Sequence, residues 1–387
     1  MSQLLPLPDG VVPPGIRSRF VDDINGLRLH VLEAGVEDRS RPLILLLHGF
    51  PELAYSWRKV IAPLAAAGYR VVAPDQRGYG RTTGWDPDYD GDLGSFRILN
   101  AVRDALGLVS ALGHREVAMV AGHDFGASVA AWSALVRPDV FRSVALMSAP
   151  FAGPPALPFD TADNAAKPKS PEPSIHDELA KLDRPRKHYQ WYYSTRQANG
   201  DMWRCARGVH AFLRGYFHYK SADWSGNRPF PLQSWTAGEL AKMPTYYIMD
   251  LNKNMAETVA PIMPSAAEIA DCRWLPDSEL RVYSGEYERT GFQGGLQWYR
   301  ARTEGVYDSE LELFSGRTID VPSIFIAGKS DWGTYQRPGN FERMQQVACT
   351  QMLGCHLLDG AGHWVQQEQP EPVTELLLQA LERLQKR

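Results

Sequence analysis

Buried apolar runs alternate with helical patterns along the first 150 residues of the chain. Two alternating apolar stretches in "SRFVDDINGLRLHVLEAG" surround Asn25-Gly26, which predicts a β-hairpin that turns at this dipeptide. The continuous apolar run 43–47 and the run in "RVVAPD" are typical of strands buried on both faces. Two further strands are predicted in "EVAMVAG" and "SVALMSAP".

Helical patterns fill the spaces between these strands. "SWRKVIAPLAAAGY" is one, and 126–136 is another. Between Phe96 and Leu112 the apolar residues recur at helical spacing, and Gly113 follows where a helix is expected to stop. The alternation of strands and helices predicts an α/β fold with a mostly parallel, doubly wound sheet.

The pattern changes after Pro150. Residues 151–173 are rich in proline and polar residues and predict an irregular linker, and the signals up to about residue 318 are mainly helical. Strand-then-turn patterns return in "DVPSIFIAGKSDW" and "CHLLDGAGHW", and an amphipathic helix closes the chain. We therefore predict an α/β core, residues 1–150 and 319–387, interrupted by a helical lid, 151–318.

Capping residues support the helical character of this lid. Ser174 stands where a helix is expected to begin, in "SIHDEL". Thr236 with Glu239, and Ser265 with Glu268, have the spacing of capping boxes. Each pair therefore predicts the start of a further helix.

The composition indicates the class of protein and its expected partners, but it says little about the chemistry of a site. The chain has 387 residues, 44% of them hydrophobic and 22% charged, which indicates a soluble globular protein. A net charge of −4 gives no reason to expect nucleic acid or an anionic membrane as a partner. The start "MSQLLPLPDGVVPP" does not resemble a signal peptide, and no apolar run is long enough to span a membrane. Nothing in the sequence indicates an oligomeric state.

The cysteines and the glycine-rich turns fit this reading. The four cysteines are scattered and form no CxxC pair, so we expect reduced thiols in a cytoplasmic protein; they are Cys205, Cys272, Cys349 and Cys355. The chain has no HExxH, and "GYGRTTG" lacks the spacing of a phosphate-binding loop. No metal or cofactor is therefore expected.

Three polar residues stand at the ends of three predicted strands, in the order Asp124, Asp331 and His363. Nucleophile, acid and then histidine is the chain order of α/β-hydrolases, and parallel sheets gather such groups at the carboxyl ends of their strands. Gly122 and Gly126 flank Asp124, as a sharp turn between strand and helix requires. This pattern predicts a catalytic triad.

A candidate oxyanion hole accompanies the triad. The loop "HGFPE" follows the first buried strand, where a backbone N–H, here that of Phe50, can bind a developing anion. The residue after the nucleophile, Phe125, would give the second N–H.

An aspartate at the nucleophile position suits attack on carbon outside a carbonyl group. Asp124 would form an ester that water can cleave, whereas a serine would form a stable ether. The carboxylate is already ionised at neutral pH, so His363 is free to activate water against the ester. Asp331 would orient the histidine ring and stabilise its charged form.

The motifs "HGFP", "DQRGYG", "GHDFG", "SDW" and "GAGHW" resemble the α/β-hydrolase superfamily in its epoxide hydrolase branch, over roughly residues 20–150 and 319–387. The lid stretches "HYQWYY" and "TGFQGGLQWYR" are similar to those that supply two tyrosines to epoxide hydrolases. The resemblance implies that Tyr189 and Tyr299 protonate the epoxide oxygen and that no cofactor is used. Tyr192 would share a helix face with Tyr189, so Tyr189, Tyr192 or Tyr193 could face the nucleophile.

The resemblance implies an epoxide hydrolase that converts a small apolar epoxide and water to a vicinal diol. Trp191, Tyr192, Trp298 and Trp364 are candidate substrate-binding residues. A haloalkane or haloacid dehalogenase is the alternative enzyme, but those families carry tryptophan or arginine directly after the nucleophile, and this chain has Phe125. A non-catalytic binding protein of the same fold is the third alternative, and it would be marked by a lost triad residue.

Overall fold

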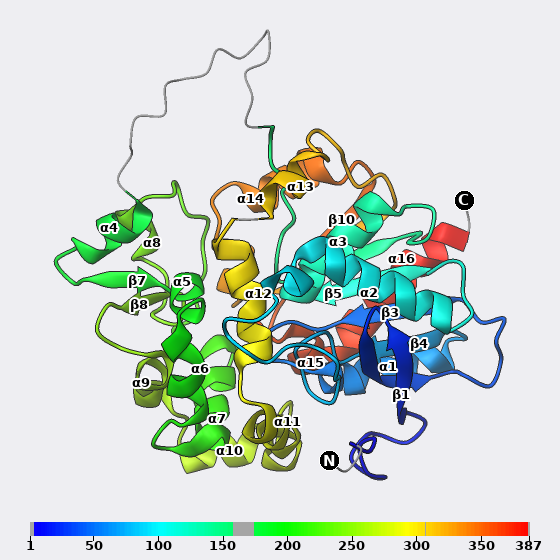
Figure 1. Cartoon of the computed structure of the whole chain (residues 1–387), viewed down its shortest axis with the longest axis horizontal. Coiled ribbons are helices and arrows are strands. Elements are labelled where there is room, and N and C mark those ends of the chain that lie inside the picture. Colours follow the sequence, from blue (N-terminus) through cyan, green and yellow to red (C-terminus); the bar gives the residue numbers. More distant parts are fainter. Residues whose placement is uncertain (1–3, 158–173, 306, 386–387) are drawn as a thin grey trace, which may run out of the picture.

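One sheet of eight strands forms the centre of the structure, a computed structural model that describes residues 4–157, 174–305 and 307–385 (Figure 1). The strand order is β1-β2-β4-β3-β5-β6-β9-β10. The pairs β1–β2 and β2–β4 are antiparallel, and all other neighbours are parallel. The strands are β1 (Arg17–Ile24), β2 (Leu27–Ala34), β3 (Leu43–Leu47), β4 (Arg70–Pro74), β5 (Met119–His123), β6 (Val144–Met147), β9 (Ser323–Gly328) and β10 (Met352–Leu358).

The strands follow the predicted pattern closely. Every residue of β3, β4, β5, β6 and β9 is buried, as expected of parallel strands covered on both faces. The predicted hairpin is confirmed, because Ile24 pairs with Leu27 and the turn residues Asn25 and Gly26 have φ values of 51° and 81°. The predicted mostly parallel α/β fold is confirmed as well.

The order of the strands reverses at β3, which lies between β4 and β5. In an open sheet of this kind, the loops at the carboxyl ends of the strands on either side of such a point form a crevice. Four loops converge there, because Phe50 follows β3, Asp124 follows β5, Asp331 follows β9 and His363 follows β10.

Helices pack on this sheet where the periodicity predicts them. In the core, α2 packs against α3 and α1 packs against α16. Gly113 follows α2 with a φ of 78°, a left-handed conformation that glycine adopts without strain at a helix end. The core helices are α1 (Arg58–Ala66), α2 (Ile98–Ala111), α3 (Phe125–Val136), α14 (Asn340–Arg343), α15 (Val365–Glu368) and α16 (Pro370–Gln385).

The chain between β6 and β9 is mainly helical, with one small antiparallel sheet of two strands that the sequence did not indicate. Residues 158–173 of the predicted linker lie outside the described residues. The elements are α4 (Ile175–Ala180), β7 (Arg186–His188), α5 (Tyr189–Tyr193), α6 (Arg196–Trp203), α7 (Gly208–Lys220), α8 (Ala237–Leu240), β8 (Ile248–Asp250), α9 (Met255–Val259), α10 (Ala266–Asp271), α11 (Asp277–Thr290), α12 (Gln293–Thr303) and α13 (Asp308–Glu312).

All three predicted helix starts are confirmed, because helices begin directly after Ser174, Thr236 and Ser265. The Ser174 side chain accepts the Asp177 N–H, and Ser265 with Glu268 forms a complete capping box. Thr236 is the N-cap residue of α8, but the predicted capping box does not form there, because the Thr236 side chain makes no capping hydrogen bond. Glu239 accepts instead from the Gln233 N–H and pairs with Lys242.

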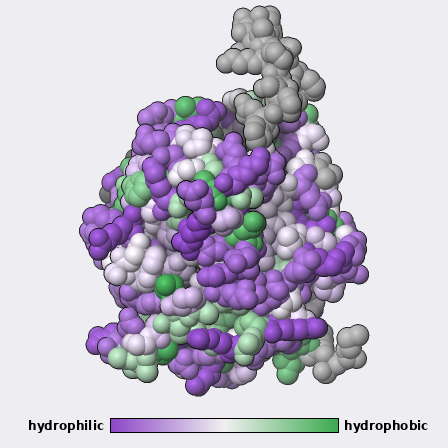
Figure 2. Space-filling view, turned by 90° about the vertical axis from the view of Figure 1, so that its left-hand side faces the viewer, coloured by the Kyte–Doolittle hydropathy of each residue, from purple (hydrophilic) through white to green (hydrophobic). Residues whose placement is uncertain are grey.

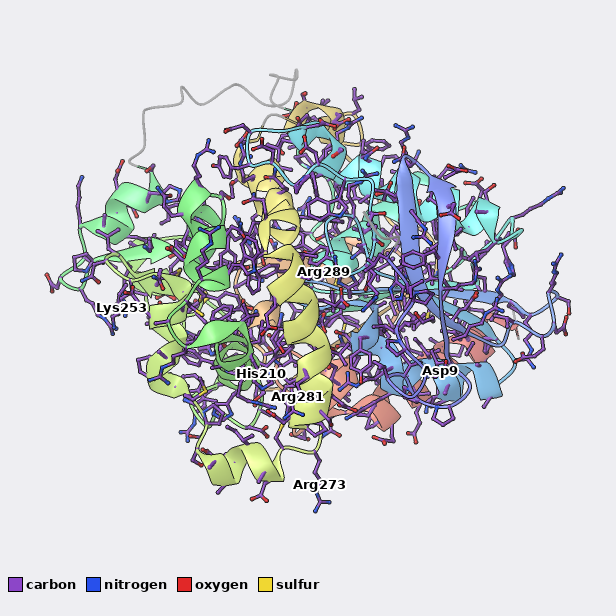
Figure 3. The ribbon with its side chains drawn as sticks, turned by 60° about the horizontal axis from the view of Figure 1, so that its bottom comes forward. Asp9, His210, Lys253, Arg273, Arg281 and Arg289 are labelled. Carbon is purple, nitrogen blue, oxygen red and sulfur yellow. The ribbon has the colours of Figure 1, made fainter. Side chains whose placement is uncertain are left out.

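The helical segment between β6 and β9, the predicted lid, contacts the rest of the chain along α11 and α12. Figure 1 shows α12 between helices α4 to α9 on one side and the core on the other, where it contacts α5 and residues 93–96. Arg281 and Arg289, both labelled in Figure 3, lie on α11, and Arg289 donates to the core carbonyl of Gly80 over 2.7 Å. The side of the molecule that carries the lid is mostly hydrophilic, with scattered apolar residues (Figure 2). Within the described ranges, no helix combines the length and apolar character that crossing a membrane demands.

Candidate active site

Asp124 stands on a strained turn between β5 and α3. Its φ of 54° and ψ of −118° are rare for a residue with a side chain, and such strain is concentrated at functional sites. A Cβ atom added to Gly122 would lie 2.0 Å from the Gly126 carbonyl oxygen, and one added to Gly49 would lie 2.3 Å from the Asp124 Cβ. The turn therefore depends on glycine at these positions, and the side chain of Asp124 is held over the end of the sheet.

His363 and Asp331 complete a chain of contacts that leads to this carboxylate. The Nδ1 atom of His363 lies 3.0 Å from Oδ1 of Asp331, which also accepts the Gly333 N–H over 2.7 Å. Because an ionised carboxylate only accepts, Nδ1 carries the proton and Nε2 presents its lone pair. Nε2 lies 3.6 Å from Oδ2 of Asp124. The ring is therefore oriented with its basic nitrogen toward Asp124.

The electrostatic surroundings keep Asp124 ionised. Burial alone would raise the pKa of this carboxyl, but the adjacent His363 imidazole and the charge of Lys220 hold the pKa well below its ordinary value. The other oxygen, Oδ1, accepts the Phe50 N–H over 3.0 Å. The N–H of Phe125 belongs to the first residue of α3 and so has no acceptor within the helix. These are the two N–H groups expected to form the oxyanion hole.

Two tyrosines from the helical segment between β6 and β9 lie near enough to Asp124 for its charge to act on them. Tyr189 opens α5 and Tyr299 lies in α12, and their ring centroids are 5.9 Å apart. The Tyr299 ring packs edge-on against Phe125 at 4.7 Å. Burial, and then the negative charge of Asp124, raise the pKa of both hydroxyls, so each keeps its proton until a strong base forms nearby. The Tyr189 hydroxyl donates to Gln336 and accepts from Gln190, each over 3.2 Å.

The comparisons with known proteins agree with this geometry. A family model described as alpha/beta hydrolase fold matches residues 42–370. Epoxide hydrolase A of Mycobacterium tuberculosis is 35% identical over 94% of this chain and 97% of its own, and epoxide hydrolase B of that organism is 32% identical over 92% and 96%. The solved epoxide hydrolase from an endophytic Streptomyces is 32% identical, with a TM-score of 0.75 over 97% of both chains.

The chain belongs to the α/β-hydrolase superfamily, in its epoxide hydrolase branch. The potato epoxide hydrolase StEH1 has the same fold at 27% identity, with a TM-score of 0.70 over 95% of this chain and 99% of its own. Membership of this branch makes the protein an enzyme of the hydrolase class.

The two other tyrosines considered on α5 have different surroundings in this epoxide hydrolase fold. The Tyr192 hydroxyl donates to Asp201 over 2.8 Å and borders a separate surface pocket. The Tyr193 hydroxyl donates to that of Tyr216 over 3.2 Å. Tyr189 therefore lies at the site, whereas the Tyr192 hydroxyl is bound away from it. The buried Tyr193 ring packs against those of Phe50 and Tyr299, at 5.2 and 4.9 Å, but its hydroxyl is bound to Tyr216.

The three candidate tryptophans lie around the site in different ways. The Trp298 ring is 5.8 Å from that of Phe125, and its indole N–H donates to the Arg77 carbonyl. The Trp364 ring stands edge-on to His363 at 4.7 Å, and its N–H donates to the Phe217 carbonyl. Trp191 lies further out and lines, together with Phe125 and Trp298, a pocket of about 580 Å³.

A buried ion pair that contacts the loop of His363 was not identified from the sequence. The Nδ1 atom of His123 lies 2.5 Å from Oε2 of Glu52, and its Nε2 atom donates to the His363 carbonyl over 2.6 Å. Although burial opposes protonation, the charge of Glu52 raises the pKa of His123. Both residues lie inside motifs that marked the site, "HGFPE" and "GHDFG", but nothing in their spacing pairs them.

Glu368 is another residue that was not identified from the sequence. Its carboxyl group binds the loop that carries His363. Its Oε2 atom accepts the N–H groups of Gly362 at 3.0 Å and of Ala222 in the lid at 2.8 Å, and its Oε1 atom accepts that of Trp364 at 3.0 Å. Both neighbours of the histidine are therefore tied to one carboxyl group. Among the described side chains, no group of three His, Cys, Asp or Glu residues could hold a metal ion.

Proposed function

We propose that this protein hydrolyses an epoxide to a vicinal diol through a covalent ester on Asp124. The observation that carries the proposal is a carboxylate on a strained turn, which lies 3.6 Å from the His363 ring nitrogen and whose charge acts on two tyrosine hydroxyls. In this proposal residues 1–150 and 319–387 form the core, and 151–318 form the lid that closes over the substrate.

The first step would form the ester. A carboxylate oxygen of Asp124 attacks an epoxide carbon, and the carbon–oxygen bond of the ring breaks. The oxygen that departs takes a proton from Tyr299 or Tyr189, whose raised pKa values keep that proton in place until the alkoxide develops. His363 has no part in this step, because the carboxylate needs no activation.

The second step would release the diol. The Nε2 atom of His363 takes a proton from water, and the hydroxide so formed attacks the carboxyl carbon of Asp124. Asp331 stabilises the imidazolium, and the N–H groups of Phe50 and Phe125 bind the oxyanion of the tetrahedral intermediate. Collapse of this intermediate expels the alcohol, which is protonated by His363, and leaves Asp124 as a carboxylic acid. Transfer of this proton to the tyrosinate formed in the first step restores both the carboxylate and the tyrosine.

The surroundings favour an epoxide over an alkyl halide. A halide leaving group needs N–H donors, and Phe125 offers none on its side chain. The indole N–H groups of Trp298 and Trp364 are already bound to backbone carbonyls. The rings of Phe125, Trp298 and Tyr299 pack together directly beside the nucleophile, which supports a small apolar epoxide with water as co-substrate. The third alternative, a binding protein without catalysis, has no support, because all three triad residues are in place.

Isotope labelling tests the covalent route. In a single turnover with styrene oxide in water enriched in oxygen-18, the first diol should carry an unlabelled oxygen from Asp124, and the label should appear in the protein. Labelled oxygen in that first diol would rule out the ester. A panel of haloalkanes serves as the comparison, and halide release without diol formation would favour a dehalogenase.

A further inference from the structure

Lys220, the last residue of α7, is a buried cation that the mechanism above does not use. Its side chain is 3% exposed, and its Nζ atom lies over four aromatic rings. The distances from Nζ to the ring centroids are 5.4 Å for Tyr216, 5.8 Å for Tyr246, 5.0 Å for Tyr247 and 5.4 Å for Trp364. Within the described part of the chain, this ammonium forms no hydrogen bond and no ion pair. A lysine is rarely buried in this way without a function for its charge.

Residues of the triad are neighbours of Lys220. The Lys220 carbonyl accepts the N–H of His363 over 2.8 Å, so the two residues are in direct backbone contact. Besides the aromatic rings, the charged groups that act on the ammonium are Asp124, Asp331 and Glu52, from the loops after β5, β9 and β3. Burial, only partly offset by these carboxylates, lowers the pKa of Lys220 to about 8. Asp124 has the largest influence of the three, and Lys220 in turn helps to keep Asp124 ionised.

We propose that Lys220 is a positioning residue for the second step, which acts through its charge on Asp124 and favours hydrolysis of the ester. The proposal rests on the ester mechanism above. According to this proposal, the Lys220 charge serves ester hydrolysis and not the stability of the lid.

The sign of the effect follows from the charge on Asp124 at each stage. Before reaction the carboxylate is negative and is stabilised by the ammonium. In the ester this negative charge is gone, while Lys220 remains buried among rings that attract a cation but do not neutralise it. The tetrahedral intermediate restores a negative charge at the same group. Lys220 therefore stabilises the transition state for hydrolysis more than it stabilises the ester, which is the condition for catalysis.

The same reasoning gives the opposite effect on the first step. Because Lys220 stabilises the free carboxylate and not the ester, its charge opposes alkylation. Removal of the Lys220 charge should thus slow ester hydrolysis and leave alkylation unchanged or faster. A lysine that only held the lid in place would alter both steps in the same direction.

Rapid-quench kinetics on the full chain separate the two steps. The variants are Lys220→Met, which removes the charge at similar volume, and Lys220→Arg, which keeps it. Lys59→Met is the matched control, because Lys59 is half-buried on α1 and its neighbouring charges include no triad residue. The amounts of free and alkylated protein are followed by intact mass after mixing with styrene oxide, and thermal unfolding reports on the fold of each variant.

We expect Lys220→Met to slow ester hydrolysis by about tenfold or more, with alkylation unchanged or faster, and Lys220→Arg to retain most of the hydrolysis rate. Hydrolysis at the wild-type rate in Lys220→Met, or an equal loss in both steps, would overturn the role of Lys220 and leave the proposed function standing. If the wild-type protein forms no ester on Asp124, the proposed function fails and this role with it.

The pH dependence of the wild-type protein gives a test that needs no variant. The ester-hydrolysis rate should fall as pH rises through the pKa of Lys220 in the ester, which lies below its value of about 8 in the free protein because the charge of Asp124 is gone. This decline should be missing in Lys220→Met. A wild-type hydrolysis rate that stays constant up to pH 9 would contradict the proposal.

Discussion

The Nε2 atom of His363 lies 3.6 Å from the Oδ2 atom of Asp124, beyond the range of a direct hydrogen bond. The basic nitrogen is thus oriented toward the carboxylate without being engaged by it, since Nδ1 holds the contact to Asp331. This geometry separates the two halves of the proposed reaction. Attack by Asp124 requires no proton transfer to His363, whereas attack of water on the ester does.

The first prediction is that His363→Asn traps the ester. Alkylation should continue, and turnover should fall by about 10²–10⁴-fold because the general base is lost. Intact mass spectrometry after exposure to an epoxide should show one added epoxide mass per protein. The adduct should be missing in Asp124→Ala. An unmodified His363→Asn protein would show that the histidine takes part in the first step.

The second prediction concerns the lid hydroxyls. Tyr189→Phe and Tyr299→Phe should each slow alkylation by about 10–100-fold, since one proton donor to the departing oxygen is lost, and the double variant should be slower than either. Tyr192→Phe is the matched control on the same helix, because its hydroxyl is bound to Asp201. Pre-steady-state burst rates measure the effect. Slow alkylation in Tyr192→Phe, with a normal rate in Tyr189→Phe, would reverse the assignment.

The sequence predicts those parts of the site that depend on local chain geometry. Asp124, Asp331 and His363 each follow a strand whose apolar run can be read directly, and parallel strands bring their carboxyl ends together. The same logic placed Phe50 beside the nucleophile, where its N–H reaches Oδ1. The hairpin turn at Asn25-Gly26 could also be predicted from the sequence, because only a few residue types adopt its backbone conformation without strain.

The parts that could not be predicted depend on contacts between distant segments. Glu52 and His123 are 71 residues apart, and their pairing exists only once β3 and β5 are neighbours. Lys220 occurs in "HYKSADW", a stretch without a recognisable pattern. Its surroundings outside α7 come from five separate segments, which carry Glu52, Asp124, Tyr246 with Tyr247, Asp331, and Trp364. The choice between Tyr189 and Tyr192 was open for the same reason, since helical spacing alone does not say which end of α5 faces the core.

The third prediction is that Glu368→Gln weakens the support of His363. A glutamine keeps one acceptor oxygen and replaces the other by an amide that cannot accept, so at least one of the three N–H groups loses its partner. We expect a loss of about 1–3 kcal/mol in the free energy of unfolding and a slower ester-hydrolysis step. Urea unfolding and single-turnover rates measure the two effects.

Glu371→Gln is the control for this experiment, because Glu371 is an exposed acid only three residues away. It should leave both quantities near the wild-type values. Equal behaviour of the two variants would mean that Glu368 does not hold the loop.

The fourth prediction concerns the contact between core and lid at Arg58. This guanidinium is 1% exposed, and it donates to the Gln367 side chain over 2.8 Å and to the Trp274 carbonyl over 3.0 Å, besides its ion pair with Glu279 on α11. Arg58→Met leaves all three acceptors without this donor. We expect the free energy of unfolding to fall by about 2–4 kcal/mol, because the penalty for a buried group that loses its partner is large.

Urea unfolding of Arg58→Met should be compared with that of Arg281→Met, which removes an arginine from the exposed side of α11. Arg281 is 70% exposed and its ion pair with Asp277 is weak in water, so we expect a change within about 0.5 kcal/mol. The catalytic step most sensitive to Arg58 should be alkylation, since Tyr299 on the neighbouring helix α12 must be held against Asp124 by the same lid. A stable Arg58→Met protein with normal alkylation would show that α11 is held to the core by its other contacts, such as that of Arg289 with Gly80.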